Sequence, residues 1–249
     1  MDVDILTKSL SEYSPTVNAT TDLIVTAVRP IGLILVSIFF LIEMDALYKY
    51  LKQEGAGFTQ EVWMVMAVKY ILAYLLVMMS SQIFDAILEL TTLILKNINH
   101  VVPMSKVSYD VELNKVKGAV IKQFFKIVAG TVQYVSIIST KLIIMMCYFE
   151  MYLLKAIGPL IIAFFMADAT RNIAVNILKM FGAVAFQLVI IFIVIRLFPV
   201  LVTDDLLKVK MSGGLESWGI AFASIAKGII FIFLLFGSQK KAKSLLNAM

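Results

Sequence analysis

Five ionisable side chains stand inside long apolar stretches of this sequence and could carry chemistry there: Lys69, Glu150, Lys155, Arg196 and Lys227. On insertion scales an ionised group at the centre of a membrane helix costs roughly 2.5–3.5 kcal/mol, so each needs compensation. Such groups could line a polar conduit, relay protons, pair between helices or subunits, or reach the surface from a tilted helix. Glu150 and Lys155 are separated by about 140° around a helix and do not face each other. Each therefore needs another partner, which favours an assembly of subunits.

A second set of polar residues recurs at helical spacing after Gly118. Lys122, Lys126, Gln133 and Thr140 lie four, seven and seven residues apart, which places them on one face of a helix. This face could line a pore or groove, or it could be the wet side of a helix lying at the membrane surface. The surface interpretation is favoured for Lys122 and Lys126.

Motifs of enzymes and metal sites are missing from the sequence. Cys147 is the only cysteine and His100 the only histidine, which excludes an intrachain disulfide and leaves no zinc cluster. Isolated glycines such as Gly130 and Gly182 have no adjacent Lys-Ser/Thr, so no phosphate-binding loop is present. We therefore expect no cofactor, no enzymatic activity and no ATP hydrolysis, and any work must be energised by a partner.

The elements that position these residues must be membrane helices. Hydrophobic residues make up 61% of the 249 residues and charged residues only 16%, and the mean hydropathy is +0.93. Soluble chains are about half apolar and a quarter charged, and a core of this size cannot hide such an excess. The composition predicts an all-α polytopic membrane protein and excludes a soluble enzyme.

Five apolar stretches are predicted to span the bilayer, with a sixth span if residues 119–140 also cross: 23–47, 62–79, 142–167, 180–202 and 217–236. The third stretch is interrupted by Gly158 and Pro159. Proline removes a backbone donor and kinks or breaks a helix. At membrane depth such a break is tolerated only where protein or a watery cavity covers it.

Polar segments divide the rest of the chain. Residues 1–22 form a polar N-terminal segment, 23–237 the transmembrane domain with a polar insert at 97–118, and 238–249 a basic tail. No Gly or Pro occurs between Phe58 and Pro103, so the second helix could run on to about residue 98. Ser81, Asp85, Glu89, Thr92 and Lys96 mark a polar stripe there, and this amphipathic part should leave the membrane or contact other subunits.

Charge predicts the orientation. The tail contains Lys240, Lys241 and Lys243, whereas residues 1–22 are net acidic. With five spans, the excess of positive charge on the cytoplasmic side puts the C-terminus in the cytoplasm and the N-terminus outside. The net positive insert at 97–118 fits this orientation poorly, and a crossing by 119–140 would reverse every later loop.

The stretch from Glu150 to Leu197 resembles a known family. It reads Tyr-Leu-Leu-Lys-Ala-Ile-Gly-Pro-Leu-Ile-Ile-Ala-Phe-Phe from Tyr152, followed by a polar joint with Asp168 and Arg171 and a long apolar span. This pattern is similar to the conserved middle of the polytopic inner-membrane subunits of type IV secretion and conjugal transfer systems (the TrbL/VirB-type family). About 50 residues carry the resemblance. The large periplasmic domain and long C-terminal extension of some members are missing.

The resemblance implies a non-enzymatic channel or platform subunit in the bacterial inner membrane. Such a subunit would form homo-oligomers among membrane lipids, contact partner ATPases and scaffold subunits, and help to pass DNA or protein across. Two other hypotheses stay open. A secondary transporter could hold a solute at the broken helix near Glu150 and Lys155, and a small pore-forming membrane protein would need a soluble state that this composition makes difficult.

Overall fold

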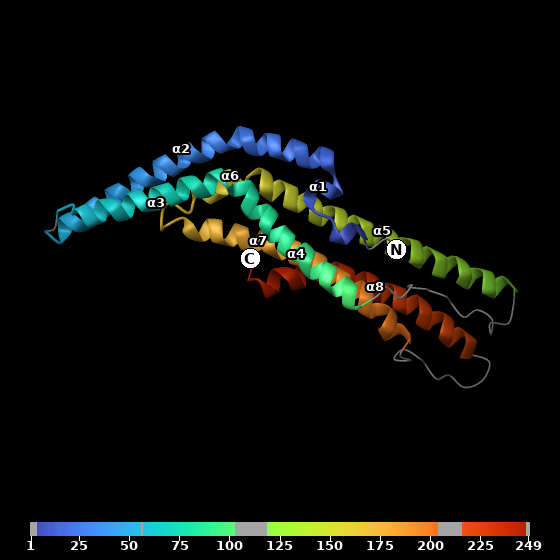
Figure 1. The fold of residues 1–249 in the computed structure, drawn as a ribbon. Helices are drawn as coiled ribbons and strands as arrows, with labels where there is room; N and C mark the ends of the chain where they lie inside the picture. Colours follow the sequence, from blue (N-terminus) through green and yellow to red (C-terminus); the bar gives the residue numbers. More distant parts are fainter. Residues whose placement is uncertain (1–3, 56, 103–118, 204–215, 248–249) are drawn as a thin grey trace. The chain divides into compact units, whose positions relative to one another are not determined.

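The computed structural model describes residues 4–55, 57–102, 119–203 and 216–247, and within these ranges the chain is helical with no strand (Figure 1). The predicted all-α class is confirmed. A 3-10 turn, η1, is followed by eight α-helices, whose bounds are η1 Asp4–Thr7, α1 Leu10–Tyr13, α2 Pro15–Gln53, α3 Gln60–Met78, α4 Ser80–Val101, α5 Ala119–Ala156, α6 Gly158–Ala163, α7 Arg171–Thr203 and α8 Glu216–Leu245.

Local sequence explains where the first helices begin. The Ser9 hydroxyl accepts a hydrogen bond from the Glu12 N–H, and the Glu12 carboxylate accepts one from the Ser9 N–H, which forms a capping box for α1. Pro15 occupies the first turn of α2, where its missing N–H costs nothing. Thr59 caps α3 by accepting from the N–H of Val62.

Four helices in the described residues are long and apolar enough to cross a membrane: Pro15–Gln53, Gln60–Met78, Lys122–Ala156 and Arg171–Phe198. The chain is therefore a membrane protein by its helices as well as by its composition. These four do not confirm the predicted count of five or six spans. Residues 119–140 and the start of 142–167 form one helix, α5, and the stretch 217–236 lies in α8, which is not among these four.

Several predicted boundaries are wrong. The second helix does not continue to residue 98, because α3 ends at Met78 and α4 begins at Ser80. Residues 168–179 are not a polar connection throughout, since α7 begins at Arg171. The domain bounds predicted after residues 22 and 237 fall inside α2 and α8, and most of the polar insert lies outside the described residues.

The chain divides into two compact units. The first comprises Met1–Thr7, Thr92–Cys147 and Phe186–Ala242, and the second comprises Lys8–Thr91, Tyr148–Ala185 and Lys243–Met249. In the first unit, α5 packs against α8 through the rings of Phe125 and Phe222, whose centroids are 5.6 Å apart at 87°. The rings of Phe198 and Phe231 join α7 to α8 at 4.8 Å.

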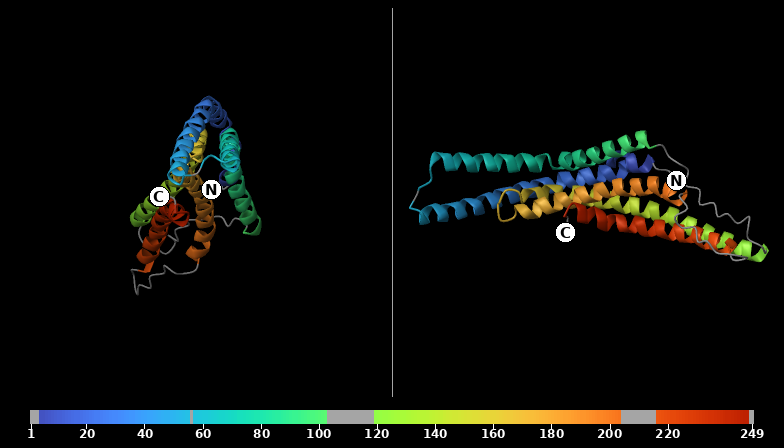
Figure 2. Two further views of the ribbon diagram at one scale, coloured as in Figure 1. Left: turned by 90° about the vertical axis from the view of Figure 1, so that its left-hand side faces the viewer. Right: turned by 90° about the horizontal axis from the view of Figure 1, so that it is seen from below.

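In the second unit, α2 and α3 form a helical hairpin, and α6 packs against both (Figures 1 and 2). Two glycines allow this close packing. A Cβ atom on Gly32 of α2 would lie 2.7 Å from the Pro159 carbonyl oxygen, and one on Gly158 would lie 2.5 Å from the ring of Phe84. Phe84 is fully buried and its ring contacts Phe181 of α7 at 4.7 Å.

Candidate functional site

Lys155 is the most deeply buried of the predicted intramembrane charges, with 2% of its side chain exposed. Its ammonium lies 2.9 Å from Asp85 Oδ1 and 3.2 Å from Asp22 Oδ1, and it also donates to Asn18 Oδ1 at 3.5 Å. Asn18 in turn donates to the second oxygen of Asp22 at 2.9 Å. We call these four residues the Lys155 cluster. It joins α2, α4 and α5 and has two carboxylates for one ammonium.

Aromatic residues fix the part of α5 that presents Lys155. The Tyr152 hydroxyl donates to the carbonyl of Leu10 at 2.6 Å, and the Tyr148 hydroxyl donates to the carbonyl of Lys8 at 2.8 Å. The Tyr148 ring also stacks on Tyr13, with centroids 3.8 Å apart. These hydrogen bonds satisfy carbonyls around α1 and hold the N-terminal segment against α5.

Lys69 lies at a second cluster, where α2 and α3 meet the segment between α6 and α7. Its ammonium is 2.8 Å from Glu43 Oε1 and 3.1 Å from Asp168 Oδ2, and Arg171 lies 3.5 Å from the other oxygen of Asp168. We call these four residues the Lys69 cluster. The hydrogen bond from Lys69 is the main cause that lowers the pKa of Asp168. The stabilising effect of the ionised Asp168 carboxylate is fully present above the pKa that Asp168 has in the unfolded chain. It is lost as the pH falls through the lowered pKa of the folded chain.

A cavity of about 600 Å³ opens beside the Lys69 cluster. Its walls come from both arms of the hairpin, and Glu43, Glu61 and Asp168 line it together with Lys69. Three carboxylates against one ammonium would favour a cationic group there. The described residues contain no group of three or more His, Cys, Asp or Glu side chains that could hold a metal ion.

Glu150 also has a partner in its own chain. Its carboxylate lies 3.5 Å from the ammonium of Lys243, within the second unit. Glu150 and Lys155 are thus not paired with each other, as the sequence predicts, but neither needs a second subunit for its pairing. The sequence-based argument that these charges favour an assembly therefore loses its basis, because both have partners within the chain.

Arg196 and Lys227 lie in the first unit. Arg196 donates from Nη2 to Asn99 Oδ1, and its guanidinium is 4.9 Å from the centroid of the Phe192 ring. Its Nε and Nη1 atoms are buried and have no hydrogen-bond partner among the described residues. Lys227 is half-buried in α8.

The helix break at Gly158 and Pro159 separates α5 from α6, as predicted. Both residues are buried. The N–H of Ile161 still donates to the carbonyl of Ile157 at 3.2 Å. The break is therefore covered by protein packing against Phe84 and Gly32, which is one of the two environments that membrane depth allows.

The polar face predicted on the 119–140 helix is only partly exposed. Lys122, Lys126 and Gln133 are exposed on α5. Thr140 is buried, and its hydroxyl donates to the carbonyl of Ser136 at 2.8 Å, which satisfies it within the helix. A polar surface along the whole length from Lys122 to Thr140 is therefore wrong, because its last member faces protein.

The residues that sequence reasoning missed are the acidic partners: Asp22, Glu43, Asp85 and Asp168. Two of them could have been found, since Asp22 immediately precedes the first apolar stretch and Glu43 lies near its end. Asp85 belongs to the polar stripe of α4, which was expected to face water or other subunits. Nothing in that stripe singles it out from Glu89.

No family model matches the chain, and no curated protein or solved structure is similar to it in these comparisons.

Proposed function

We propose that the chain is a non-enzymatic membrane subunit of a type IV secretion or conjugation machine, where it forms part of the channel or platform that passes DNA or protein. The observation that carries the proposal is the apolar surface of α2 and α3. Only 17% of the most apolar window of each helix is buried, against 50% in α5 and 67% in α7. Such a surface must meet lipid or other subunits, because water would penalise it.

The internal pairing of Lys69, Glu150 and Lys155 changes the reason for expecting an assembly. These charges are compensated within the chain, so oligomerisation does not depend on them. Copies of the chain, scaffold subunits and partner ATPases would attach through those exposed surfaces that lipid does not cover. Helices that pair Lys69, Glu150 and Lys155 within the chain and expose apolar faces are compatible with a platform subunit.

The location that goes with this function is the bacterial inner membrane. The number of spans decides the orientation. Four spans place both termini on one side, whereas a fifth, which α8 would supply, places the N-terminus outside and the C-terminus in the cytoplasm as the charges predict. The resemblance around Gly158 and Pro159 supports the family assignment through residues that pack the core of the second unit.

The test is the state of the protein extracted from its native membrane in mild detergent. We expect a homo-oligomer, or a complex that contains secretion ATPases or scaffold subunits, when mass is measured by light scattering and partners by mass spectrometry. Monomers that bind a small solute saturably would instead indicate a transporter. A variant at the buried break gives the control: a solute site at the broken helix would be weakened by Pro159→Ala, whereas the proposed function predicts no saturable solute binding by either protein.

A further inference from the structure

We propose that the hydrocarbon layer of the bilayer surrounds the second unit between its two charge clusters, and that the end of the α2–α3 hairpin stands in water. The fatty-acyl chains would then contact residues 23–42 of α2 and residues 70–84 of α3 and α4. This assigns a lipid partner to the apolar faces of these helices. The inference holds whether or not the chain belongs to a secretion machine.

The spacing of the clusters matches the thickness of a bilayer. Asp22 of the Lys155 cluster and Glu43 of the Lys69 cluster both lie on α2. At 1.5 Å per residue they are about 31 Å apart along the helix, and Lys69 and Asp85 on the α3–α4 arm are about 24 Å apart before the length of the lysine side chain is added. The hydrocarbon core of a typical bilayer is about 30 Å thick. Each cluster would therefore lie at one edge of that core.

The segments between the clusters carry almost no charge. Residues 70–84 and 156–167 contain no Asp, Glu, Lys, Arg or His, and residues 23–42 contain only Arg29 of these types. The large exposed side chains in this layer are mostly apolar and include Leu23, Ile34, Leu41, Ile71, Leu72 and Leu75, whereas Thr26 and Gln82 are the exposed polar ones. Arg29 is half-buried and lies about 10 Å from the level of Asp22, so its long side chain can extend toward that edge.

A different depth follows if α3, Gln60–Met78, spans the membrane by itself. At that depth Lys69 lies in the middle of the hydrocarbon layer. The part of α2 that follows Glu43 and runs beside α3 then lies among the acyl chains. Asp45 and Lys49 would then face lipid with side chains 59% and 70% exposed. Exposed charges are costly among acyl chains. The depth set by the two clusters leaves both residues in water.

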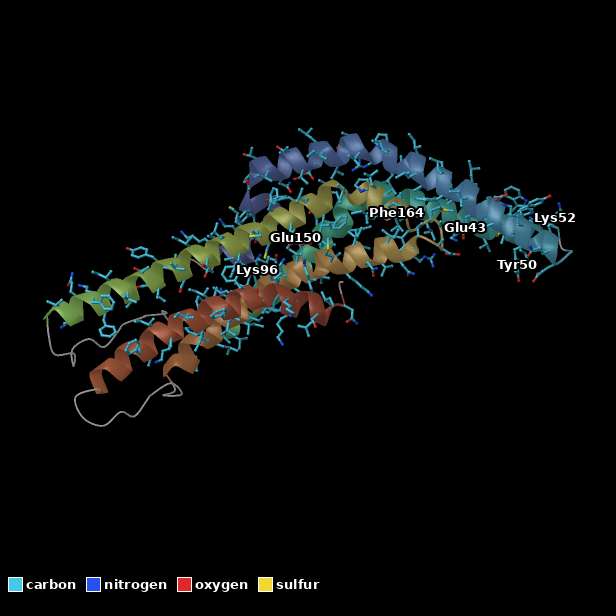
Figure 3. The ribbon with its side chains drawn as sticks, turned by 180° about the vertical axis from the view of Figure 1, so that it is seen from behind. Glu43, Tyr50, Lys52, Lys96, Glu150 and Phe164 are labelled. Carbon is cyan, nitrogen blue, oxygen red and sulfur yellow. The ribbon has the colours of Figure 1, made fainter. Side chains whose placement is uncertain are left out.

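The end of the hairpin has the composition of a membrane surface. From Glu43, α2 continues for about 15 Å to Gln53, and Figure 3 shows Glu43, Tyr50 and Lys52 following one another along it. The rings of Tyr48 and Phe58 stack at 5.9 Å, and Trp63 contacts Phe58 at 5.4 Å. Trp and Tyr concentrate where the acyl layer meets water.

This depth also has a consequence for the chain ends. Glu150 precedes Lys155 by about 7 Å along α5, on the outer side of the Lys155 cluster, and it pairs with Lys243 near the end of α8. The last turn of α8 would therefore lie at the same edge of the hydrocarbon layer as Asp22. Both ends of the second unit would lie on one side of the membrane, in contrast to the orientation expected from the charge of the tail.

The experiment compares two cysteines that are equally exposed in the protein but differ in depth. Ile34 is 59% and Met64 61% exposed. In a Cys147→Ser background in lipid nanodiscs, we expect Met64→Cys to react with a membrane-impermeant maleimide at least tenfold faster than Ile34→Cys. In sodium dodecyl sulfate the two should react equally. Equal protection of both in nanodiscs would overturn the proposed depth.

Fluorescence quenching distinguishes whether lipid or another protein subunit covers the exposed face of α2. In a Trp63→Phe, Trp218→Phe background, Ile34→Trp should be quenched by lipids brominated in mid-chain, and absence of quenching would show that another subunit covers this face. Native Trp63, as the remaining tryptophan in the Trp218→Phe variant, should be quenched more strongly by aqueous acrylamide than by these lipids.

In intact cells, Ser11→Cys and Ser244→Cys should react alike with the impermeant maleimide. Labelling of only one of them would contradict the shared side.

Discussion

Replacing Asp22 and Asp85 together by asparagine should lower the free energy of unfolding by about 3–5 kcal/mol, the range for a buried ion that loses its partner. The reason is the position of Lys155, whose ammonium is buried and bonded to both carboxylates. After the double substitution only neutral amides would remain near it. A buried charge in that environment stays uncompensated.

The measurement is unfolding in detergent, followed by circular dichroism, for the double variant and two controls. Adding Lys155→Met to the double variant removes the unpaired charge and should recover most of the loss. Asp45→Asn breaks the exposed pair between Asp45 and Lys49 on the same helix and should cost no more than about 1 kcal/mol. If the double variant unfolds like the native chain, Lys155 is not held by these carboxylates.

Gly32→Ala should destabilise the second unit by roughly 1–3 kcal/mol, the usual cost of overpacking a tight contact. The new Cβ would lie 2.7 Å from the Pro159 carbonyl oxygen and 3.2 Å from a methyl group of Val77. The first neighbour is backbone and cannot rotate away. The substitution therefore has to push α2 and α6 apart.

Gly130→Ala provides the matched control, because this glycine also lies inside a long helix but has nothing within 4 Å of the added Cβ. Helix propensity alone should make that variant up to about 1 kcal/mol more stable. Unfolding of the two variants under the same conditions tests the contact. A stabilised Gly32→Ala would mean that α2 and α6 do not approach each other as closely as the structure has them.

Composition and chemistry of single residues predict the class of fold and one of its breaks. Long continuous apolar runs favour membrane helices, which satisfy their backbone hydrogen bonds internally, and the described residues are helical. Gly158 and Pro159 mark a real boundary because proline cannot continue the hydrogen-bond ladder. The boundary between α3 and α4 lies at Met79, where no nearby proline or glycine predicts it.

Polar residues are weaker guides to where helices end. Lys141 and Glu150 interrupt the apolar pattern, which suggests two segments, yet α5 runs from Ala119 to Ala156. A charge does not disturb the helical backbone and only needs a place for its side chain. The same applies to Arg171, which begins α7 within a stretch that reads as a polar connection.

For a related reason, the sequence predicts the lysines of the two charge clusters but not which acidic residues pair with them. Lys69 and Lys155 stand out in the sequence because charges are costly in apolar helices. Their partners are set by packing between distant segments, as in the bond between Lys155 and Asp85. Acidic residues at the ends of apolar stretches are the usable signal, since Asp22 and Glu43 both occupy such positions.

The most direct test of the central claim is transfer by a native host from which the gene has been deleted. We predict that conjugal DNA transfer or protein secretion falls to the level of a strain without the secretion ATPase, and that a copy of the native gene restores it. Immunoblots of the partner subunits in the same strains check that the machine is still produced. Transfer and secretion at the native level in the deletion strain would contradict the proposed function.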